Sequence, residues 1–292
     1  MIHRHGKSAV EARMVQIMRY EAMKCLNVIV YYDNKEEIKQ YITKTSLIAD
    51  GMVDFAIVVN KDTNGQADEL NHELSVSANA HYEFMDFGKN VGYLNAMLET
   101  LRAMNWEGYD YVILSNTDID YEMKDFFPEL SHREYSSEIG VVAPSVYSSS
   151  NRYYQNPHYR DRISKGHFKR LYFLFKYPAF GRFYLKLAEI KGKSKPSVKQ
   201  ESCYVYSPNG SYMIFTKRFV SLIKDYYYKA LLYSEESCVG ELLLKYGLKC
   251  FYDNSLEVIH HESTVTGKIN YKKRFALWRE SIGVILEEFY GW

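Results

Sequence analysis

The stretch 109–120 carries the residue types best suited to chemistry in this chain. An apolar, β-branched run at 111–114 predicts a buried strand. Side chains with oxygen atoms follow it directly: Ser115, Asn116, Thr117, Asp118 and Asp120. Carboxylates with amide and hydroxyl neighbours suit a hard cation such as Mg²⁺ or Mn²⁺, above all one shared with phosphate groups. The alternative is a strand that ends in an Asx turn and caps the next helix.

Earlier predicted strands end in the same kind of residue. The strand expected at 55–59 runs into Asn60 and Asp62, and the strand expected at 27–32 runs into Asp33. Predicted helices separate these strands, and such alternation favours a mostly parallel sheet. Open α/β sheets bind ligands at the carboxyl ends of their strands. No P-loop is present and no G-x-G-x-x-G follows a strand, which argues against an ATPase or a dinucleotide-binding protein.

Two further pairs of residues could contribute chemistry. Glu235 and Glu236 open a predicted helix that ends near Gly247, and His260 and His261 close a short predicted strand. Carboxylates in the first turn of a helix are ordinary partners of the helix dipole, and a histidine at a strand end is often structural. Two histidines in a row leave one free to face a site, and the sequence does not say which.

The composition is that of a globular protein with room for one large α/β domain or two small ones. The chain has 292 residues, of which 47% are hydrophobic, and a formal net charge of +1. A near-neutral charge argues against a nucleic-acid binder. Four cysteines without CxxC spacing, and no secretory leader pattern, predict reduced thiols in a cytoplasmic protein. No apolar run approaches the ~18–20 residues of a transmembrane helix.

Residues 151–200 differ in character from the rest of the chain. Between 160 and 200 there are twelve Lys or Arg residues against two acidic ones, and Phe, Tyr and Leu are interleaved with them. A basic, aromatic segment of this kind suits the surface of an anionic bilayer. A helical hairpin that packs its aromatics on the sheet and leaves its lysines in solvent fits the same pattern. The sequence leaves both interpretations open.

Several landmarks, in order along the chain, resemble motifs of the family 2 inverting glycosyltransferases, in the rhamnosyltransferase-like form of bacterial polysaccharide synthesis. The segment 30–33, Val-Tyr-Tyr-Asp, is similar to the family's Thr-Tyr-Asn turn after the first strand. The segment 88–93, Gly-Lys-Asn-Val-Gly-Tyr, is similar to its Glu-Asn-x-Gly turn. The segment 114–118, Leu-Ser-Asn-Thr-Asp, resembles its D-x-D site in the Asn-x-Asp form.

Two later landmarks complete the resemblance. The segment 233–236, Tyr-Ser-Glu-Glu, resembles the family's Glu-Asp catalytic motif, with Gly247 at the familiar offset. The segment 258–264 is similar to its closing Val-x-His followed by Ser-Thr. The match covers roughly 27–290. The chain departs from the family where Asn116 replaces the first Asp of D-x-D, Glu236 stands for the usual Asp, and Cys238 and Leu242 stand for a frequent Asp and Arg.

The resemblance implies an α/β protein with the GT-A nucleotide-diphospho-sugar transferase fold, a mostly parallel central sheet with flanking helices. A single domain is expected at 27–290, after an N-terminal helical extension at 1–26 that contains a helix from Ser8 to about Lys24. The nucleotide-binding half is expected at 27–120. The acceptor half is expected at 121–290, with a basic-aromatic insertion at 151–200.

The implied activity is inverting, metal-dependent transfer of a sugar from a UDP- or dTDP-linked donor to a hydroxyl of a glycan, free or lipid-linked. The implied cofactor is Mg²⁺ or Mn²⁺. Residue roles follow from the matched motifs: for catalysis, Glu236 as the base beside Glu235; for metal, Asp118 with His260 or His261; for nucleotide, Tyr32, Asn60, Asp62, Asn90 and Asn116; for acceptor, Asn209 and Gly210.

The sequence also bears on two alternative functions and on the location of the protein. A nucleotidyltransferase on a similar sheet needs a Gly-rich phosphate loop after the first strand, and 31–37 has no Gly and no Arg. A non-catalytic scaffold that binds sugar nucleotides is disfavoured because Asp118 and Glu236 are retained. The expected location is cytoplasmic, with peripheral contact to the inner face of the cell membrane through 160–199 if that segment binds bilayers.

Overall fold

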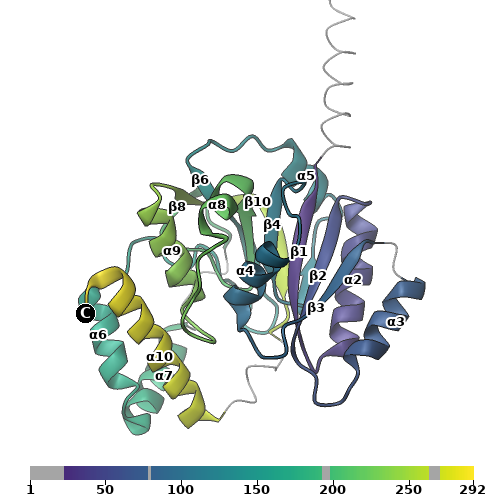
Figure 1. The fold of residues 1–292 in the computed structure, drawn as a ribbon. Helices are drawn as coiled ribbons and strands as arrows, with labels where there is room; N and C mark the ends of the chain where they lie inside the picture. The colour runs from purple at the N-terminus through teal and green to yellow at the C-terminus, as the bar shows by residue number, and fades with distance from the viewer. Residues whose placement is uncertain (1–22, 78–79, 193–197, 263–269) are drawn as a thin grey trace, which may run out of the picture.

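The computed structural model describes residues 23–77, 80–192, 198–262 and 270–292. The predicted helix at 8–24 therefore lies outside the described residues, except for its last two positions, which are not helical. Cys25 and Leu26, expected to end the N-terminal extension, belong instead to the first strand of the sheet. The described elements form one ten-stranded sheet with helices on both faces and a layer of three helices at one end (Figure 1).

The first half of the sheet is parallel, as the strand–helix alternation predicts. Its strands lie in the order β3-β2-β1-β4, and each neighbouring pair is parallel. The strands are β1 (Cys25–Tyr32), β2 (Val53–Lys61), β3 (Tyr82–Asp86) and β4 (Tyr111–Ser115). The helices between them are α2 (Lys35–Ala49), α3 (Ala67–Ser77) and α4 (Tyr93–Ala103). Helix α3 was not predicted from the sequence.

The second half of the sheet is mixed. Strand β9 lies between β4 and β6 and is antiparallel to both, whereas β10 is parallel to β6 and antiparallel to β5 and β8. The strands are β5 (Ile119–Tyr121), β6 (Ile139–Ser148), β7 (Tyr153–Tyr154), β8 (Cys203–Val205), β9 (Tyr212–Thr216) and β10 (Lys249–His260). Parallel pairing therefore dominates only the first half. β10 is longer than the short strand predicted before His260, and its register shifts between Asp253 and Glu257.

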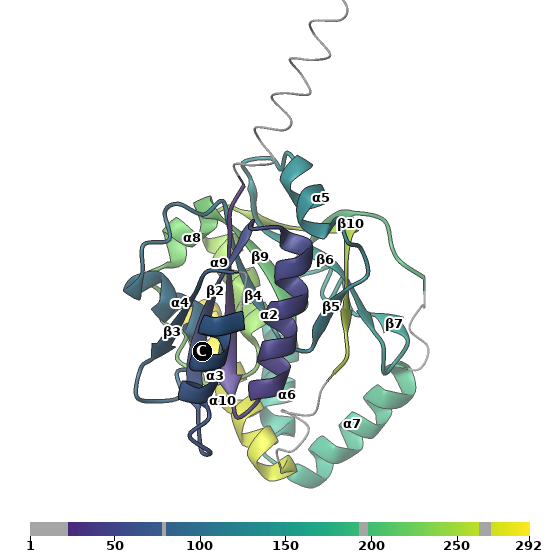
Figure 2. The ribbon, with the colours of Figure 1, turned by 90° about the vertical axis from the view of Figure 1, so that its right-hand side faces the viewer.

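Alternation along β1 explains why the sheet is buried on both faces. Leu26 and Val28 belong to one hydrophobic cluster, while Ile29 and Tyr31 belong to another. Successive side chains of a strand point to opposite faces, so each strand of a covered sheet needs apolar residues at consecutive positions. Helices α2, α3 and α5 (Phe126–His132) supply the second cluster. Helices α4, α8 (Lys217–Ile223), α9 (Glu235–Lys245) and α10 (Tyr271–Tyr290) supply the first (Figure 2).

The layer at one end consists of α6 (Lys165–Leu174), α7 (Pro178–Gly192) and α10. It is tied to α9 through Glu241, whose side chain is 3% exposed. Arg162 donates two hydrogen bonds to this carboxylate, at 2.9 and 2.7 Å, and the hydroxyls of Tyr206 and Tyr290 donate to it at 2.9 and 2.8 Å. A buried charge with this many partners is well compensated. The cluster therefore fixes α9, whose first turn carries Glu235 and Glu236, against the outer helices.

Two further properties of the described residues concern membrane-spanning helices and cysteines. No helix within the described ranges has the length and apolar character needed to cross a membrane. All four cysteines, Cys25, Cys203, Cys238 and Cys250, are free thiols.

Candidate active site

A closed ring of buried hydrogen bonds holds the end of β4. Ser115 Oγ donates to Asn27 Oδ1 on β1 at 2.9 Å, Asn27 Nδ2 donates to the hydroxyl of Tyr41 at 2.6 Å, and that hydroxyl lies 2.8 Å from Ser115 Oγ. The backbone N–H of Asn116 donates to the carbonyl of Ser211 on the loop before β9, at 2.8 Å. Because these polar groups satisfy one another, the point where the chain leaves the sheet is fixed.

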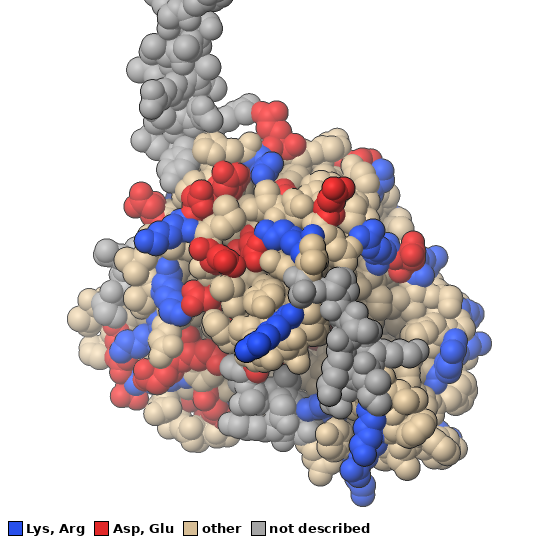
Figure 3. All heavy atoms as spheres, turned by 180° about the vertical axis from the view of Figure 1, so that it is seen from behind, with Lys and Arg blue, Asp and Glu red and all other residues tan. Residues whose placement is uncertain are grey.

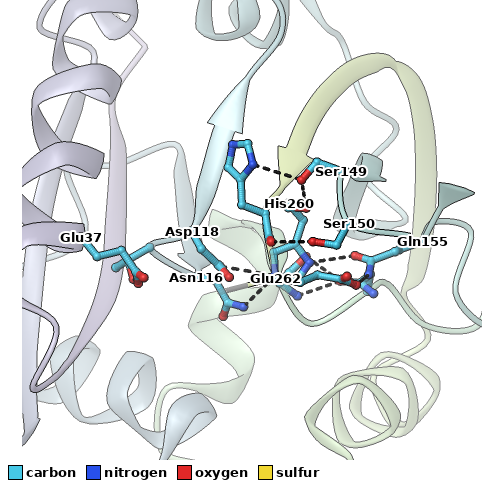
Figure 4. Close-up of polar contacts among 12 residues, drawn as sticks. Glu37, Asn116, Asp118, Ser149, Ser150, Gln155, His260 and Glu262 are labelled. Atoms are coloured by element: carbon cyan, nitrogen blue, oxygen red, sulfur yellow. Dashed lines mark hydrogen bonds and ion pairs between the residues drawn. The ribbon is translucent and has the colours of Figure 1, made fainter. Parts of the chain in front are cut away.

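Strand register brings Asp118 to His260, which lies 142 positions later in the sequence. β5 pairs antiparallel with β10 so that Ile119 faces His260, and the N–H of His261 donates to the carbonyl of Asp118 at 2.9 Å. His260 Nε2 lies 3.3 Å from Asp118 Oδ1 (Figure 4), and the two side chains are 13% and 8% exposed. Asn116 Nδ2 lies 3.4 Å from the same ring nitrogen.

The far side of the His260 ring is oriented by Gln155, in the segment after β7. Gln155 Nε2 donates to Glu262 Oε1 at 2.6 Å, so its amide oxygen is turned to His260 Nδ1, at 2.9 Å. Asn151 donates to the other oxygen of Glu262 (Figure 4). An amide oxygen only accepts hydrogen bonds, so Nδ1 carries a proton, and in the neutral ring Nε2 then presents a lone pair toward Asp118.

The Asp118 carboxylate and the His260 ring nitrogen are both groups that could ligate a divalent cation. A lone pair and a carboxylate oxygen that face each other repel, and either a proton on the ring or a metal ion between them relieves this repulsion. The 3.3 Å separation fits neighbouring ligands of one ion, because ligands about 2.1 Å from an octahedral cation lie about 3 Å apart. Within the described residues, no group of three His, Cys, Asp or Glu side chains could hold a metal. Any ion here would share its coordination with a ligand or with water.

The structure directs His261 elsewhere. Its Nδ1 lies 3.1 Å from Ser149 Oγ, and its Nε2 lies 3.8 Å from Asp120 Oδ2. Asp120 also forms an ion pair with Lys44 at 2.7 Å, and this hydrogen bond lowers the pKa of Asp120 against the effect of burial. Of the two adjacent histidines, His260 is therefore the one that faces Asp118.

The first turn of α9 carries the predicted catalytic carboxylates. Tyr233 and Ser234, just before it, have φ of 75° and 59°, left-handed values that are rare outside glycine. This turn folds the N–H of Tyr233 back onto Glu235 Oε1 at 2.9 Å. Glu235 is buried, and burial together with the neighbouring charge of Glu236 raises its pKa to about 8. At neutral pH the buried member of the pair therefore keeps its proton.

Glu236 lies against the loop before β9, which contains both predicted acceptor residues. A Cβ atom added to Gly210 would lie 2.6 Å from Glu236 Oε1, so the carboxylate fits there because residue 210 has no side chain. The Asn209 side chain turns back on its own loop, where its Oδ1 accepts from the N–H and Oγ of Ser211 at 2.9 and 2.6 Å. Gly210 is brought to the carboxylate, and Asn209 shapes the loop that carries it.

Tyr93, the first residue of α4, lies close to both groups. Its hydroxyl is buried and has no hydrogen-bond partner among the described residues. Burial raises the pKa of Tyr93 well above its ordinary value, and the charges of Glu235, Asp118 and Glu236 raise it further. Charges influence a phenol in this way only when they are near it. The Asp118 carboxylate and the glutamate pair therefore lie within electrostatic range of the Tyr93 hydroxyl.

The four remaining nucleotide candidates lie at the ends of β1 and β2 and before α4. Asn60 braces the turn at 91–92, accepting from the N–H of Val91 at 3.0 Å and donating to the carbonyl of Gly92 at 3.1 Å. Asp62 accepts from the N–H of Gln66 at 2.8 Å, and Asn90 from the N–H of Gly92 at 2.9 Å. Lys61 Nζ lies 5.0 Å above the ring of Tyr32. These side chains shape the edge, and their contact with a nucleotide stays a prediction.

Sequence reasoning missed several residues of this site. Gln155, which orients His260, belongs to no motif and lies in the basic-aromatic insertion expected at 151–200, and Glu262, which holds Gln155, stands between the matched residues of the closing motif. Thr117 hydrogen-bonds to Glu37 of α2, and Asn34 donates to the Thr117 hydroxyl at 3.0 Å. The only sequence signal for these partners was an excess of polar residues after predicted strands, which does not say which of them meet.

Comparison with known proteins supports the fold. No family model matches the chain, and no curated protein matches its sequence. Solved structures do match: the mannosyltransferase PcManGT of Pyrobaculum calidifontis, in complex with GDP-Man and Mn²⁺, has a TM-score of 0.55 at 9% identity over 83% of this chain. GalNAc-T7 with UDP, GalNAc and Mn²⁺ has a TM-score of 0.54 at 9% identity over 90% of it. A mycobacterial protein has a TM-score of 0.51 at 12% identity over 94%.

These likenesses define the fold class. The chain has the α/β fold of GT-A glycosyltransferases, a central sheet of many strands with flanking helices, as the sequence predicted. It matches 58% of the length of the mannosyltransferase, 48% of GalNAc-T7 and 78% of the mycobacterial protein.

Proposed function

We propose that this protein is an inverting glycosyltransferase that moves a sugar from a UDP- or dTDP-linked donor to a hydroxyl of a glycan, as in cell-surface polysaccharide synthesis. The observation that carries the proposal is the pairing of two chemically different groups near Tyr93. One is the Asp118–His260 pair, and the other is Glu236 against Gly210. The GT-A fold supports the proposal. So do the ligands of two proteins with that fold: GDP-Man and Mn²⁺ in the mannosyltransferase, and UDP, GalNAc and Mn²⁺ in GalNAc-T7.

Asp118 and His260 are the residues that would hold Mg²⁺ or Mn²⁺, with Asn116 beside them at the nucleotide. A divalent cation supplies positive charge to the diphosphate leaving group. Gln155 keeps a lone pair on His260 Nε2, and Glu262 keeps Gln155 in place. This second layer of hydrogen bonds is typical of histidines that ligate metals. His261, which bonds to Ser149, is the weaker candidate.

Glu236 is the proposed base. Inversion by direct displacement requires that the acceptor hydroxyl lose its proton as it attacks, and a positioned carboxylate can accept it. The raised pKa of Glu235, caused by burial and then by the charge of Glu236, separates the roles of the two carboxyl groups, with Glu235 as the one that holds a proton more tightly. Gly210 leaves the space in which the Glu236 carboxylate lies.

The test has a binding step and a rate step. Nucleotide sugars with Mn²⁺ are screened for a rise in melting temperature, because a ligand of the folded state stabilises it. With the donor so found, Glu236→Gln should keep the rise and lower nucleotide release to an acceptor by about 10²–10⁴-fold. Asp118→Ala should lose both the Mn²⁺-dependent rise and the transfer. Glu287→Gln, at an exposed position of α10, is the matched control.

Two results would contradict the assignment. If Asp118→Ala transfers sugar at the normal rate with an unchanged metal requirement, the cation site is elsewhere. If Glu236→Gln is fully active while Glu235→Gln is inactive, the base is the other carboxylate.

A further inference from the structure

Helices α6 and α7 present an apolar face that no described part of the chain covers. Its side chains, here called the outer face, are Phe173, Tyr177, Phe180, Phe183, Tyr184 and Leu187. Phe180 and Phe183 are 62% and 64% exposed, and Phe173 is 54% exposed. On α7 the positions 180, 183 and 187 recur at the spacing of one side of a helix. The rings of Tyr177 and Phe180 are in contact, with centres 6.2 Å apart, and exposed apolar side chains that gather in this way mark interaction sites.

The opposite side of α7 is already used for packing. Gly181 is buried, and a Cβ atom there would lie 2.9 Å from the ring of Phe275 on α10. Phe175, at the end of α6, stacks on Phe275 with ring centres 5.4 Å apart and planes within 9°. The helical hairpin that the sequence left open as one interpretation packs mainly on α10 rather than on the sheet with one set of aromatics, and it exposes a second set. The outer face is therefore additional to the core.

The segment that carries the outer face is rich in positive charge. Seven Lys or Arg residues belong to α6, α7 and the turn between them, and five of these lie at 169–186: Lys169, Arg170, Lys176, Arg182 and Lys186. Among the described residues none of the five forms an ion pair with a carboxylate, while Lys176 and Arg182 lie over the rings of Tyr177 and Tyr271, at 5.7 and 5.6 Å. The acidic residues between 160 and 192 are Asp161 and Glu189. The lower right of Figure 3 shows Lys and Arg among uncharged side chains over this layer.

We propose that the outer face of α6 and α7 docks onto the surface of an anionic lipid bilayer. An amphipathic helix with aromatic and leucine side chains on one side and Lys and Arg at its borders lies in the headgroup region, where the rings enter the interface and the cations meet lipid phosphates. A second copy of this chain is a poorer occupant, because the same five positive charges would face one another.

Bilayer docking would bring lipid-linked acceptors to the carboxylate side of the site. Tyr159 pairs through its backbone with Ser207, three positions before the Gly210 that lies against Glu236. Burial raises the pKa of Tyr159 to about 12, and the charges of Glu236 and then of Tyr184 on the outer face contribute, so Tyr184 lies within electrostatic range of Tyr159. This consequence rests on the proposed function, whereas bilayer binding itself does not.

Sedimentation with vesicles tests the docking. The protein should sediment with phosphatidylcholine vesicles that contain phosphatidylglycerol, and it should stay in the supernatant with vesicles of phosphatidylcholine alone. High salt should weaken the binding to the anionic vesicles, because salt screens exposed charges. Lys176→Ala and Arg182→Ala should each weaken binding about fivefold, the equivalent of about 1 kcal/mol per basic residue at an anionic surface. The double variant Phe180→Ser with Phe183→Ser should lose the binding that persists at high salt.

The control is the double variant Leu47→Ser with Val76→Ser, which removes two apolar side chains, each 79% exposed, from α2 and α3. It should bind vesicles like the unaltered protein. Failure of the unaltered protein to sediment with anionic vesicles at low salt would overturn the proposal, as would normal binding by both the basic and the aromatic variants. A dimer that dissociates on Phe180→Ser with Phe183→Ser, without vesicle binding, would assign the face to a second copy of the chain.

Discussion

The orientation of His260 by Gln155 can be tested by replacing Gln155 with leucine, which keeps a similar volume and removes the amide. The amide oxygen lies 2.9 Å from His260 Nδ1, and the amide nitrogen is held by Glu262 at 2.6 Å. Without that acceptor, the proton of the ring is free to move to Nε2, the atom that faces Asp118. Loss of such a second-layer partner typically costs about 10–100-fold in metal affinity. On that scale Gln155→Leu should weaken Mn²⁺ binding by about 1.4–2.7 kcal/mol.

The assay is a titration of Mn²⁺ into the protein with UDP present, in which electron paramagnetic resonance reports the free ion. Gln40→Leu makes the same replacement at an exposed position of α2 and should bind Mn²⁺ normally. Circular dichroism shows whether each variant keeps the fold. If His260→Ala loses the ion and Gln155→Leu binds it with unchanged affinity, then Gln155 does not orient the ring. If both variants bind Mn²⁺ normally, the cation lies elsewhere.

Two further predictions concern the region around α9. The pKa of Glu235 is raised from about 4.5 to about 8 in the folded protein. Between these pH values the folded state therefore binds more protons than the unfolded state, and the free energy of unfolding should fall as the pH rises. Urea titrations at several pH values should show a smaller fall for Glu235→Gln, and an unchanged fall would mean that another group causes it. Gly92 has φ of +89°, and a Cβ there would lie 2.4 Å from the carbonyl oxygen of Leu231, whereas Gly88 has φ of +69° and no atom within 4 Å. Gly92→Ala should therefore cost more stability than Gly88→Ala, by about 1–3 kcal/mol, and equal losses in denaturant would show that the contact with Leu231 is relieved by a small shift.

The strands of the first half and the residues at their ends could be predicted because the signal is local. A β-branched run such as 111–114 marks a strand wherever it lies, and the polar residues that follow must emerge at the sheet edge. The pairing of Asp118 with His260 depends instead on the register of β5 against β10, and β5 has three residues with no pattern of their own. The choice of His260 over His261 follows from that register, because adjacent residues of a strand face opposite ways.

The partners of the predicted residues could not be foreseen for the same reason. Gln155 reaches His260 across 105 positions, and nothing in the composition of either segment refers to the other. Helices α6 and α7 show another limit of prediction from the sequence. Their aromatic and basic residues were visible in the sequence, but which rings face α10 and which face solvent depends on the contact of Gly181 with Phe275.

The three-helix layer of α6, α7 and α10 contributes no strand to the sheet, and this gives the molecule a modular character. Arg162 before α6 and Tyr290 at the end of α10 meet on one carboxylate, that of Glu241 on α9. The exposed side chains of α6 and α7 can therefore change in the course of evolution while the register of the strands stays the same. In protein engineering, α6 and α7 could likewise be replaced by a hairpin with different exposed side chains, so that the same sheet is attached to a different surface.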